Sequence, residues 1–160
     1  MPEVTLVSTA GDDVDLAAAA SGTLVLYCYP RTGRPGEELP PGWDDFPGAR
    51  GCTPQACAFR DHSDELVRRG ARIHGLSGQT VSEQREFADR VGLPYPLLSD
   101  PGLELAGALR LPTFELDGSL YYGRLTLIGR EREIVKVFYP VFPPDHNAAD
   151  VATWLAAHPE

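Results

Sequence analysis

A continuous apolar run over residues 23–29, ended by Pro30, constrains the fold of this chain more than any other stretch. The run is Thr-Leu-Val-Leu-Tyr-Cys-Tyr and shows no alternation of polar and apolar residues. This pattern predicts a strand that is buried on both faces of its sheet. A sheet covered on both faces needs helices on each side, so the run favours an α/β fold.

Further strands and helices follow in a mixed order. Strands are predicted over residues 4–8, 71–77, 114–116, 121–122, 124–128 and 134–139. Helices are predicted for 15–20, from Cys52 to a stop at Gly70, from Thr80 or Ser82 to Val91, for 101–109, and after a cap at Asn147. We therefore expect one domain over residues 1–160, with a mixed central β-sheet flanked by helices.

Composition excludes several classes of partner. The net charge of −9 argues against binding to nucleic acid or to anionic membranes. No stretch approaches the length of a transmembrane helix, and the first residues do not resemble a signal peptide. Three cysteines is an odd number without a disulfide-framework pattern, which favours a reducing, cytoplasmic location.

Cys52 stands where the first long helix is predicted to begin. Thr53 and Pro54 suit the first helical turn, because proline lacks an N–H that this turn would leave unpaired. Unpaired backbone N–H groups and the helix dipole would then point at the Cys52 sulfur and favour its anionic form. A thiolate placed in this way is a nucleophile near neutral pH.

Cys57 follows Cys52 by five positions within the same predicted helix. This spacing separates the two Cα atoms by roughly 8–9 Å and makes the side chains diverge. A disulfide requires a Cα separation below about 7 Å, so a bond between them requires the first turn to unwind. Two alternatives remain open from the spacing alone. The cysteines are incidental core thiols, or they bind a metal together with His62.

Residues 31–50 form a long connection rich in Pro and Gly that leads directly to Cys52. Structureless connections of this length inside a domain tend to be functional, so we expect it to lie over or beside the sulfur. Trp43 and Phe46 suggest that it packs on its own domain or on a partner. The alternative is a tolerated surface insertion. Cys28, inside the apolar run, is expected to be a small buried hydrophobe.

Several of these segments together resemble one family, the peroxiredoxins, and most closely its Q-type or bacterioferritin-comigratory branch. Residues 51–61, Gly-Cys-Thr-Pro-Gln-Ala-Cys-Ala-Phe-Arg-Asp, are similar to the segment of that branch that carries its reactive cysteine. Residues 75–77 and 93–100 resemble a later block, and Gly123-Arg124 resembles the position of an active-site arginine. Tyr29-Pro30 is similar to the end of the family's strand before the active site.

The resemblance implies a thioredoxin-like fold and a thiol-dependent peroxidase. Cys52 would attack a peroxide and become a sulfenic acid, and Cys57 would then form a disulfide with it. A thioredoxin-like reductant would restore both thiols. Arg124 would hold the thiolate and polarise the peroxide, Pro30 would shield the site from water, and no metal or organic cofactor is implied. The protein would be a monomer or a homodimer.

One departure from the family pattern concerns the peroxide itself. The family carries a Thr or Ser three residues before the reactive cysteine, where this chain has Ala49, with Thr32 or Thr53 as substitutes. This departure keeps a redox-responsive binding module with weak peroxidase activity as an alternative. A thioredoxin-like disulfide oxidoreductase is disfavoured, because that chemistry usually uses Cys-x-x-Cys, which this chain lacks.

Overall fold

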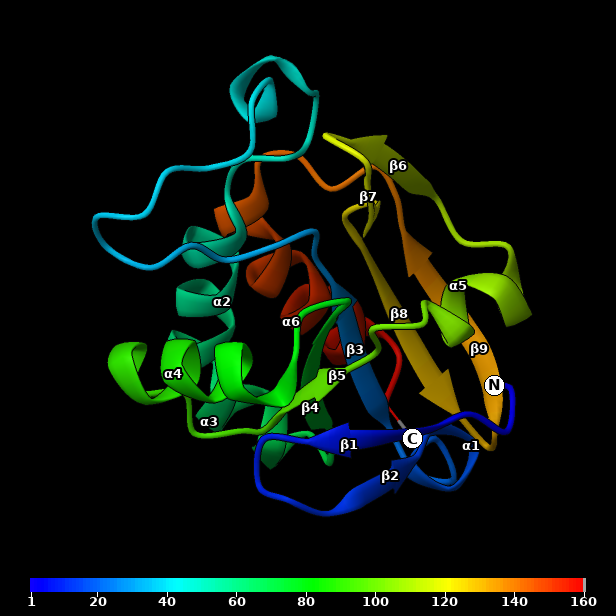
Figure 1. Cartoon of the computed structure of the whole chain (residues 1–160). Coiled ribbons are helices and arrows are strands. Elements are labelled where there is room, and N and C mark those ends of the chain that lie inside the picture. The colour runs from blue at the N-terminus through cyan, green and yellow to red at the C-terminus, as the bar shows by residue number, and fades with distance from the viewer. Residues whose placement is uncertain (160) are drawn as a thin grey trace.

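A seven-stranded mixed sheet forms the centre of the computed structural model, which describes residues 1–159 (Figure 1). The strands lie in the order β2-β1-β5-β4-β3-β8-β9. Their bounds are β1 Thr5–Ser8, β2 Asp13–Asp15, β3 Leu24–Cys28, β4 Arg72–Ser77, β5 Leu97–Ser99, β8 Leu125–Arg130 and β9 Glu133–Phe138. Strands β3, β4 and β5 are parallel, whereas β8 and β1 pair antiparallel on either side of them.

Helices cover both faces of this sheet, as predicted. Their bounds are α1 Leu16–Ala19, α2 Cys52–Asp61, α3 Ser63–Arg68, α4 Val81–Val91, α5 Glu104–Leu109 and α6 Asn147–Ala157. Short 3-10 turns occupy Trp43–Asp45 (η1) and Pro144–His146 (η2). Helices α2, α3, α4 and α6 contribute to one apolar core, and α1 and α5 contribute to the other. Among the described residues, every helix is too short or too polar to span a lipid bilayer.

The central strand β3 confirms the prediction from its apolar run. All five of its residues are buried. Val25 and Tyr27 belong to the core on the α2 side, whereas Leu24, Leu26 and Cys28 belong to the core on the α5 side. The strand therefore separates two cores, which requires an apolar side chain at every position.

The helix predicted to run from Cys52 to Gly70 is divided in two, which corrects the prediction. His62 leaves the helical conformation with φ −95° and ψ 0°, and α3 starts at the next residue. The Ser63 hydroxyl donates to the carbonyl of Arg60, and the His62 ring bonds to that of Ala58. These side chains occupy backbone carbonyls of the last turn and compete with helix continuation. Leu66 of α3 is fully buried, whereas its neighbour Val67 is 60% exposed.

Helix α4 begins at Thr80, one of the two predicted cap positions, and Thr80 and Glu83 form a capping box in which they satisfy each other's backbone N–H groups. The prediction that Asn147 caps α6 is wrong. Asn147 has helical angles and is the first residue of the helix, with His146 at the cap position. Its amide is used in a buried side-chain network instead, together with Gln55 and Thr126.

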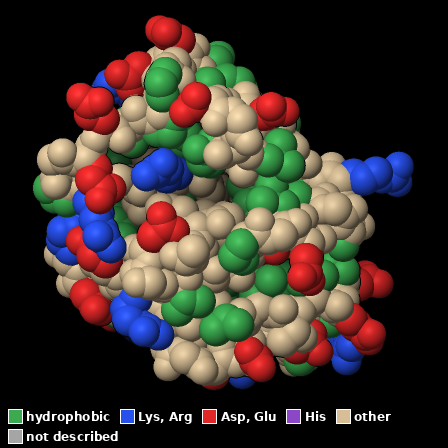
Figure 2. Space-filling view, in the orientation of Figure 1, with side chains coloured by type: hydrophobic (Ala, Val, Ile, Leu, Met, Phe, Trp, Pro, Cys, Tyr) green, Lys and Arg blue, Asp and Glu red, His purple; other side chains and the backbone are tan. Residues whose placement is uncertain are grey.

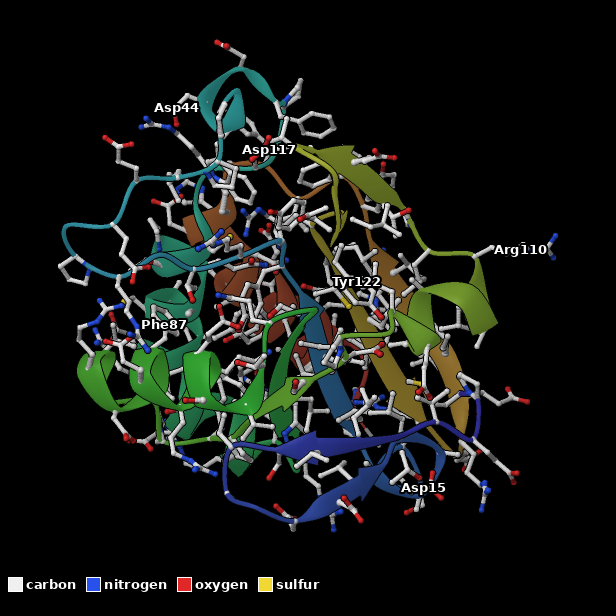
Figure 3. The ribbon with its side chains drawn as sticks, viewed as in Figure 1. Asp15, Asp44, Phe87, Arg110, Asp117 and Tyr122 are labelled. Atoms are coloured by element: carbon white, nitrogen blue, oxygen red, sulfur yellow. The ribbon has the colours of Figure 1, made fainter. Side chains whose placement is uncertain are left out.

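A small second sheet pairs β6 (Thr113–Leu116) with β7 (Ser119–Tyr122) around the predicted turn at Asp117-Gly118. Both turn residues have positive φ, as a tight two-residue hairpin requires. The hairpin supports the 31–50 segment through aromatic contacts. Phe46 stacks on Phe114 at 4.0 Å between ring centroids, and Trp43 meets Tyr121 at 5.2 Å. Asp44 and Asp117 are labelled at this end of the molecule, at the top of Figure 3.

Candidate active site

Cys52 is the first residue of α2, as the sequence predicts. Gly51 precedes it with φ +104°, a conformation that residues with a side chain rarely adopt. A Cβ atom at Gly51 would also lie 2.5 Å from Pro144 Cγ in η2. Glycine is therefore required for the chain to turn into α2 at this point. No side chain among the described residues caps the helix start, which leaves its first N–H groups available to the sulfur or to a ligand.

The Cys52 sulfur meets a buried arginine. Arg124 Nη2 lies 3.2 Å from Cys52 Sγ, and the two residues are 4% and 5% exposed. The same nitrogen lies within 3.2 Å of the carbonyl oxygens of Gly48, Ala49 and Arg50. The contact places a permanent positive charge directly beside the sulfur, in a site that water hardly reaches, where interactions between charges are strong.

Arg124 is in turn positioned by a network that the sequence did not reveal. Arg124 Nη1 donates to Gln55 Oε1 at 2.6 Å, and Gln55 Nε2 donates to Asn147 Oδ1 at 3.0 Å. The Thr126 hydroxyl donates to the same oxygen at 2.6 Å. All four side chains are buried. The network joins β8, α2 and α6, so the orientation of the guanidinium is set by the packing of three elements.

Cys57 lies one and a half turns along α2 and is half-buried. All three cysteines are free, and α2 is continuous from Cys52 to Asp61. The helical geometry keeps Cys52 and Cys57 too far apart for a disulfide in this conformation. The Tyr95 hydroxyl donates to the carbonyl of Ala56 at 3.1 Å, which adds a contact that must break if this part of α2 unwinds.

A cleft of about 470 Å³ opens onto Cys52, and the 31–50 segment forms much of its wall. The lining is Arg31, Thr32, Gly33, Leu39, Trp43, Ala49, Arg50, Gly51, Cys52, Thr53 and Pro54. This confirms that the segment lies beside the sulfur. Its aromatic residues pack on the chain's own hairpin, as described above. No three His, Cys, Asp or Glu side chains gather as ligands for a metal ion within residues 1–159.

Comparisons with known proteins agree with this geometry. The family model described as Redoxin matches residues 1–155. The chain belongs to the redoxin family. It is 32% identical to the chloroplastic peroxiredoxin Q of Arabidopsis thaliana over 157 residues, which are 98% of this chain and 65% of that protein. The corresponding protein of Gentiana triflora is 33% identical over 155 residues, which are 96% of this chain and 64% of the relative.

Solved structures extend the likeness to the whole fold. The peroxidoxin BcpB of Mycobacterium tuberculosis superimposes with a TM-score of 0.76 at 28% identity, covering 98% of this chain and 94% of that one. A peroxiredoxin Q of Xanthomonas campestris superimposes with a TM-score of 0.77 at 26% identity, covering 97% of this chain and 90% of that one. These relatives place the chain with the Q-type peroxiredoxins and confirm the thioredoxin-like fold. The chain spans 64–65% of the length of the two plant proteins.

Within this redoxin, some of the residues expected to act on the peroxide lie beside Cys52 or line its cleft, whereas Pro30 does not line that cleft. Ala49 is buried beside Cys52, and its carbonyl oxygen lies 3.7 Å from Cys52 Sγ. Thr32 and Thr53 both line the cleft, but the Thr32 hydroxyl already donates to Gln79 Oε1 at 3.2 Å. Pro30 is buried and lines an adjoining cavity with Gln79 rather than the cleft of Cys52. Its shielding role remains a prediction.

Proposed function

We propose that this protein is a thiol-dependent peroxidase in which Cys52 is the residue that reacts with hydrogen peroxide or organic hydroperoxides. The observation that carries the proposal is the 3.2 Å contact between Arg124 Nη2 and Cys52 Sγ at the start of α2. It joins the two features that activate a thiol, a fixed positive charge and an uncapped helix N-terminus. Membership of the redoxin family supports the same reaction.

The first step transfers one oxygen atom. The Cys52 thiolate attacks the terminal oxygen of ROOH, so that an S–O bond forms and the O–O bond breaks. The leaving alkoxide takes up the proton of the hydroperoxide and departs as ROH, while the sulfur is oxidised to the sulfenate, which is protonated to the sulfenic acid. Arg124 and the first N–H groups of α2 stabilise the negative charge that moves from sulfur to the leaving oxygen.

The second step closes a disulfide. The Cys57 thiol attacks the Cys52 sulfenic acid, an S–S bond forms and water leaves. The first turn of α2 unwinds beforehand, because the intact helix keeps these two sulfurs apart. A thioredoxin-like dithiol then reduces the disulfide by exchange and is itself oxidised. Peroxiredoxin Q relatives support this choice of reductant class.

A peroxide-consumption assay coupled to a thioredoxin system tests the proposal. We expect steady-state turnover in the wild-type protein and none above background in Cys52→Ser. Cys57→Ser is expected to consume about one equivalent of peroxide per protein and then stop, because its sulfenic acid has no partner for recycling. Undiminished turnover of Cys57→Ser would remove Cys57 from the cycle. Oxidation of Cys52 without turnover would favour the redox-responsive module instead.

A further inference from the structure

Two buried tyrosines hold the backbone beside Cys57 from outside its helix. The hydroxyl of Tyr95, two residues before β5, donates to the carbonyl oxygen of Ala56 in α2 at 3.1 Å. The hydroxyl of Tyr27 in β3 lies 3.1 Å from that of Tyr95. Because Tyr95 uses its hydrogen at Ala56, Tyr27 donates to Tyr95. This phenol pair, Tyr27 and Tyr95, therefore ties the residue next to Cys57 to the central sheet.

The phenol pair is enclosed by the core. Tyr27, Ala56 and Tyr95 are 0%, 1% and 8% exposed, so water hardly competes for these bonds. The Tyr27 ring stacks on Phe59 of α2 with 4.5 Å between the ring centroids. Gly75 of β4 leaves the space for this phenol, since a Cβ atom there would lie 2.6 Å from the Tyr27 hydroxyl oxygen. Burial raises the pKa of both phenols, so both hydroxyls keep their hydrogens near neutral pH.

The bond from Tyr95 reaches α2 at the part of the helix that separates its two cysteines. The last turn is anchored elsewhere, because Arg60 Nη1 donates to the carbonyl oxygen of Val91 in α4 at 2.7 Å. A disulfide between the cysteines requires the backbone between them to leave the helical conformation. Unwinding that extends as far as Ala56 breaks the bond to Tyr95 and leaves the Arg60 anchor in place.

The contacts on the neighbouring surface are of a different kind. Charged side chains gather along the left side of the face in Figure 2, where Figure 1 places α4 and the 31–50 segment. There Arg90 pairs with Glu86 at 2.8 Å and donates to the carbonyl oxygen of Gly33, but the two charged side chains are 31% and 32% exposed. Exposed ion pairs contribute little to stability. The buried bond at Ala56 is accordingly the stronger constraint on the chain near Cys52.

We propose that Tyr95 is a positioning residue for the second step, and that its bond to Ala56, supported by Tyr27, sets how fast α2 opens for disulfide formation. The inference rests on the proposed peroxidase function, since it concerns the fate of the Cys52 sulfenic acid. Either Cys57 attacks that sulfur and water leaves, or a second hydroperoxide transfers an oxygen atom to it and departs as ROH, which leaves a sulfinic acid. A helix that opens slowly favours the sulfinic acid.

The test removes one hydroxyl at a time and follows both steps by rapid mixing with hydrogen peroxide. Tyr95→Phe deletes the donor to Ala56 and keeps the ring. Tyr122→Phe is the matched control, because it deletes a buried hydroxyl that donates to Asp100 in the other core. We expect Tyr95→Phe to form the disulfide about three- to tenfold faster, as the loss of one hydrogen bond allows. The rate of Cys52 oxidation should not change.

Tyr27→Phe keeps the bond from Tyr95 to Ala56 but removes its support, so it should speed the second step by a smaller factor. It carries the same test if Tyr95→Phe folds poorly. Sulfinic acid at Cys52 after excess peroxide, measured by mass spectrometry, should decrease as the second step becomes faster. An unchanged second step in folded Tyr95→Phe would overturn the proposal. Equal acceleration in Tyr122→Phe would also overturn it, because a general loss of stability would then explain the effect.

Hydrogen exchange of the reduced protein separates this proposal from the peroxidase function, because it reports the opening of α2 without any peroxide. The amides of Ala56 and Cys57 pair with carbonyls of the preceding turn. We expect them to exchange about three- to tenfold faster in Tyr95→Phe than in the wild type or Tyr122→Phe. If this difference is found while no peroxide oxidises Cys52, the peroxidase function fails and the hold of Tyr95 on α2 stands. If Tyr95→Phe and the wild type exchange equally, the role of Tyr95 is wrong.

Discussion

Cys52 and Cys28 are two buried thiols with opposite surroundings. Cys28 lies in the middle of the sheet, fully buried in β3, and burial raises the pKa of its thiol far above the ordinary value. Cys52 is buried almost as completely but at the start of a helix, with a guanidinium nitrogen 3.2 Å from its sulfur. Burial among apolar groups suppresses the thiolate, whereas burial among fixed donors stabilises it. Under the proposed function, the polarity of the surroundings, rather than exposure, decides which cysteine reacts.

Replacing each cysteine in turn tests this comparison most strongly, because only the loss of Cys52 should abolish peroxide reduction. We expect Cys52→Ser to lower the rate of peroxide reduction by about a thousandfold or more, because the nucleophile is lost. Cys28→Ala should leave that rate within about twofold and cost about 1 kcal/mol of folding free energy through the lost packing. Initial rates and chemical denaturation of the two variants measure both effects. A large loss of activity in a stably folded Cys28→Ala would contradict this assignment.

Removing the charge beside Cys52 should make its surroundings more like those of Cys28. We expect Arg124→Ala to slow the reaction of Cys52 with hydrogen peroxide at neutral pH by about a hundredfold, as loss of a transition-state donor does elsewhere. Alkylation of Cys52 by iodoacetamide should slow in parallel, because both reactions use the thiolate. Arg124→Lys keeps the positive charge but lacks the planar guanidinium with its several fixed donors. Its reaction rate should therefore lie between those of the wild type and Arg124→Ala. Unchanged rates in Arg124→Ala would show that the helix start alone activates the sulfur.

A smaller effect is expected from the network behind Arg124. Gln55→Leu removes the acceptor of Arg124 Nη1 and leaves a buried donor without its partner. We expect a loss of about 1–3 kcal/mol in folding free energy and a reduction of up to about tenfold in the peroxide rate. Gln55→Glu, which keeps an acceptor at this place, is the matched control and should retain the faster rate. Equal rates in both variants would mean that Gln55 does not position the arginine.

The sequence predicted those parts of the molecule that depend on neighbours along the chain. The two-sided burial of β3, a helix start at Thr80 (one of the two predicted cap positions) and the place of Cys52 at a helix start all follow from local pattern and were confirmed. These features are decided within a few residues, where propensity and periodicity apply.

The parts that depend on contacts between distant residues were missed or mistaken. Gln55 and Asn147 lie 92 positions apart, and no local pattern indicates that their amides meet. Asn147 is a good capping residue by type, yet its side chain is used in the buried network instead. The break at His62 depends on side-chain bonds to the carbonyls of Ala58 and Arg60, which compete with an otherwise helical pattern.

The most direct test of the central claim is mass spectrometry of the protein after one equivalent of hydrogen peroxide, with free thiols alkylated after unfolding. The account predicts a disulfide between Cys52 and Cys57 with Cys28 recovered as an alkylated thiol. In Cys57→Ser it predicts a sulfenic acid at Cys52. Oxidation at Cys28 with Cys52 left reduced would contradict it.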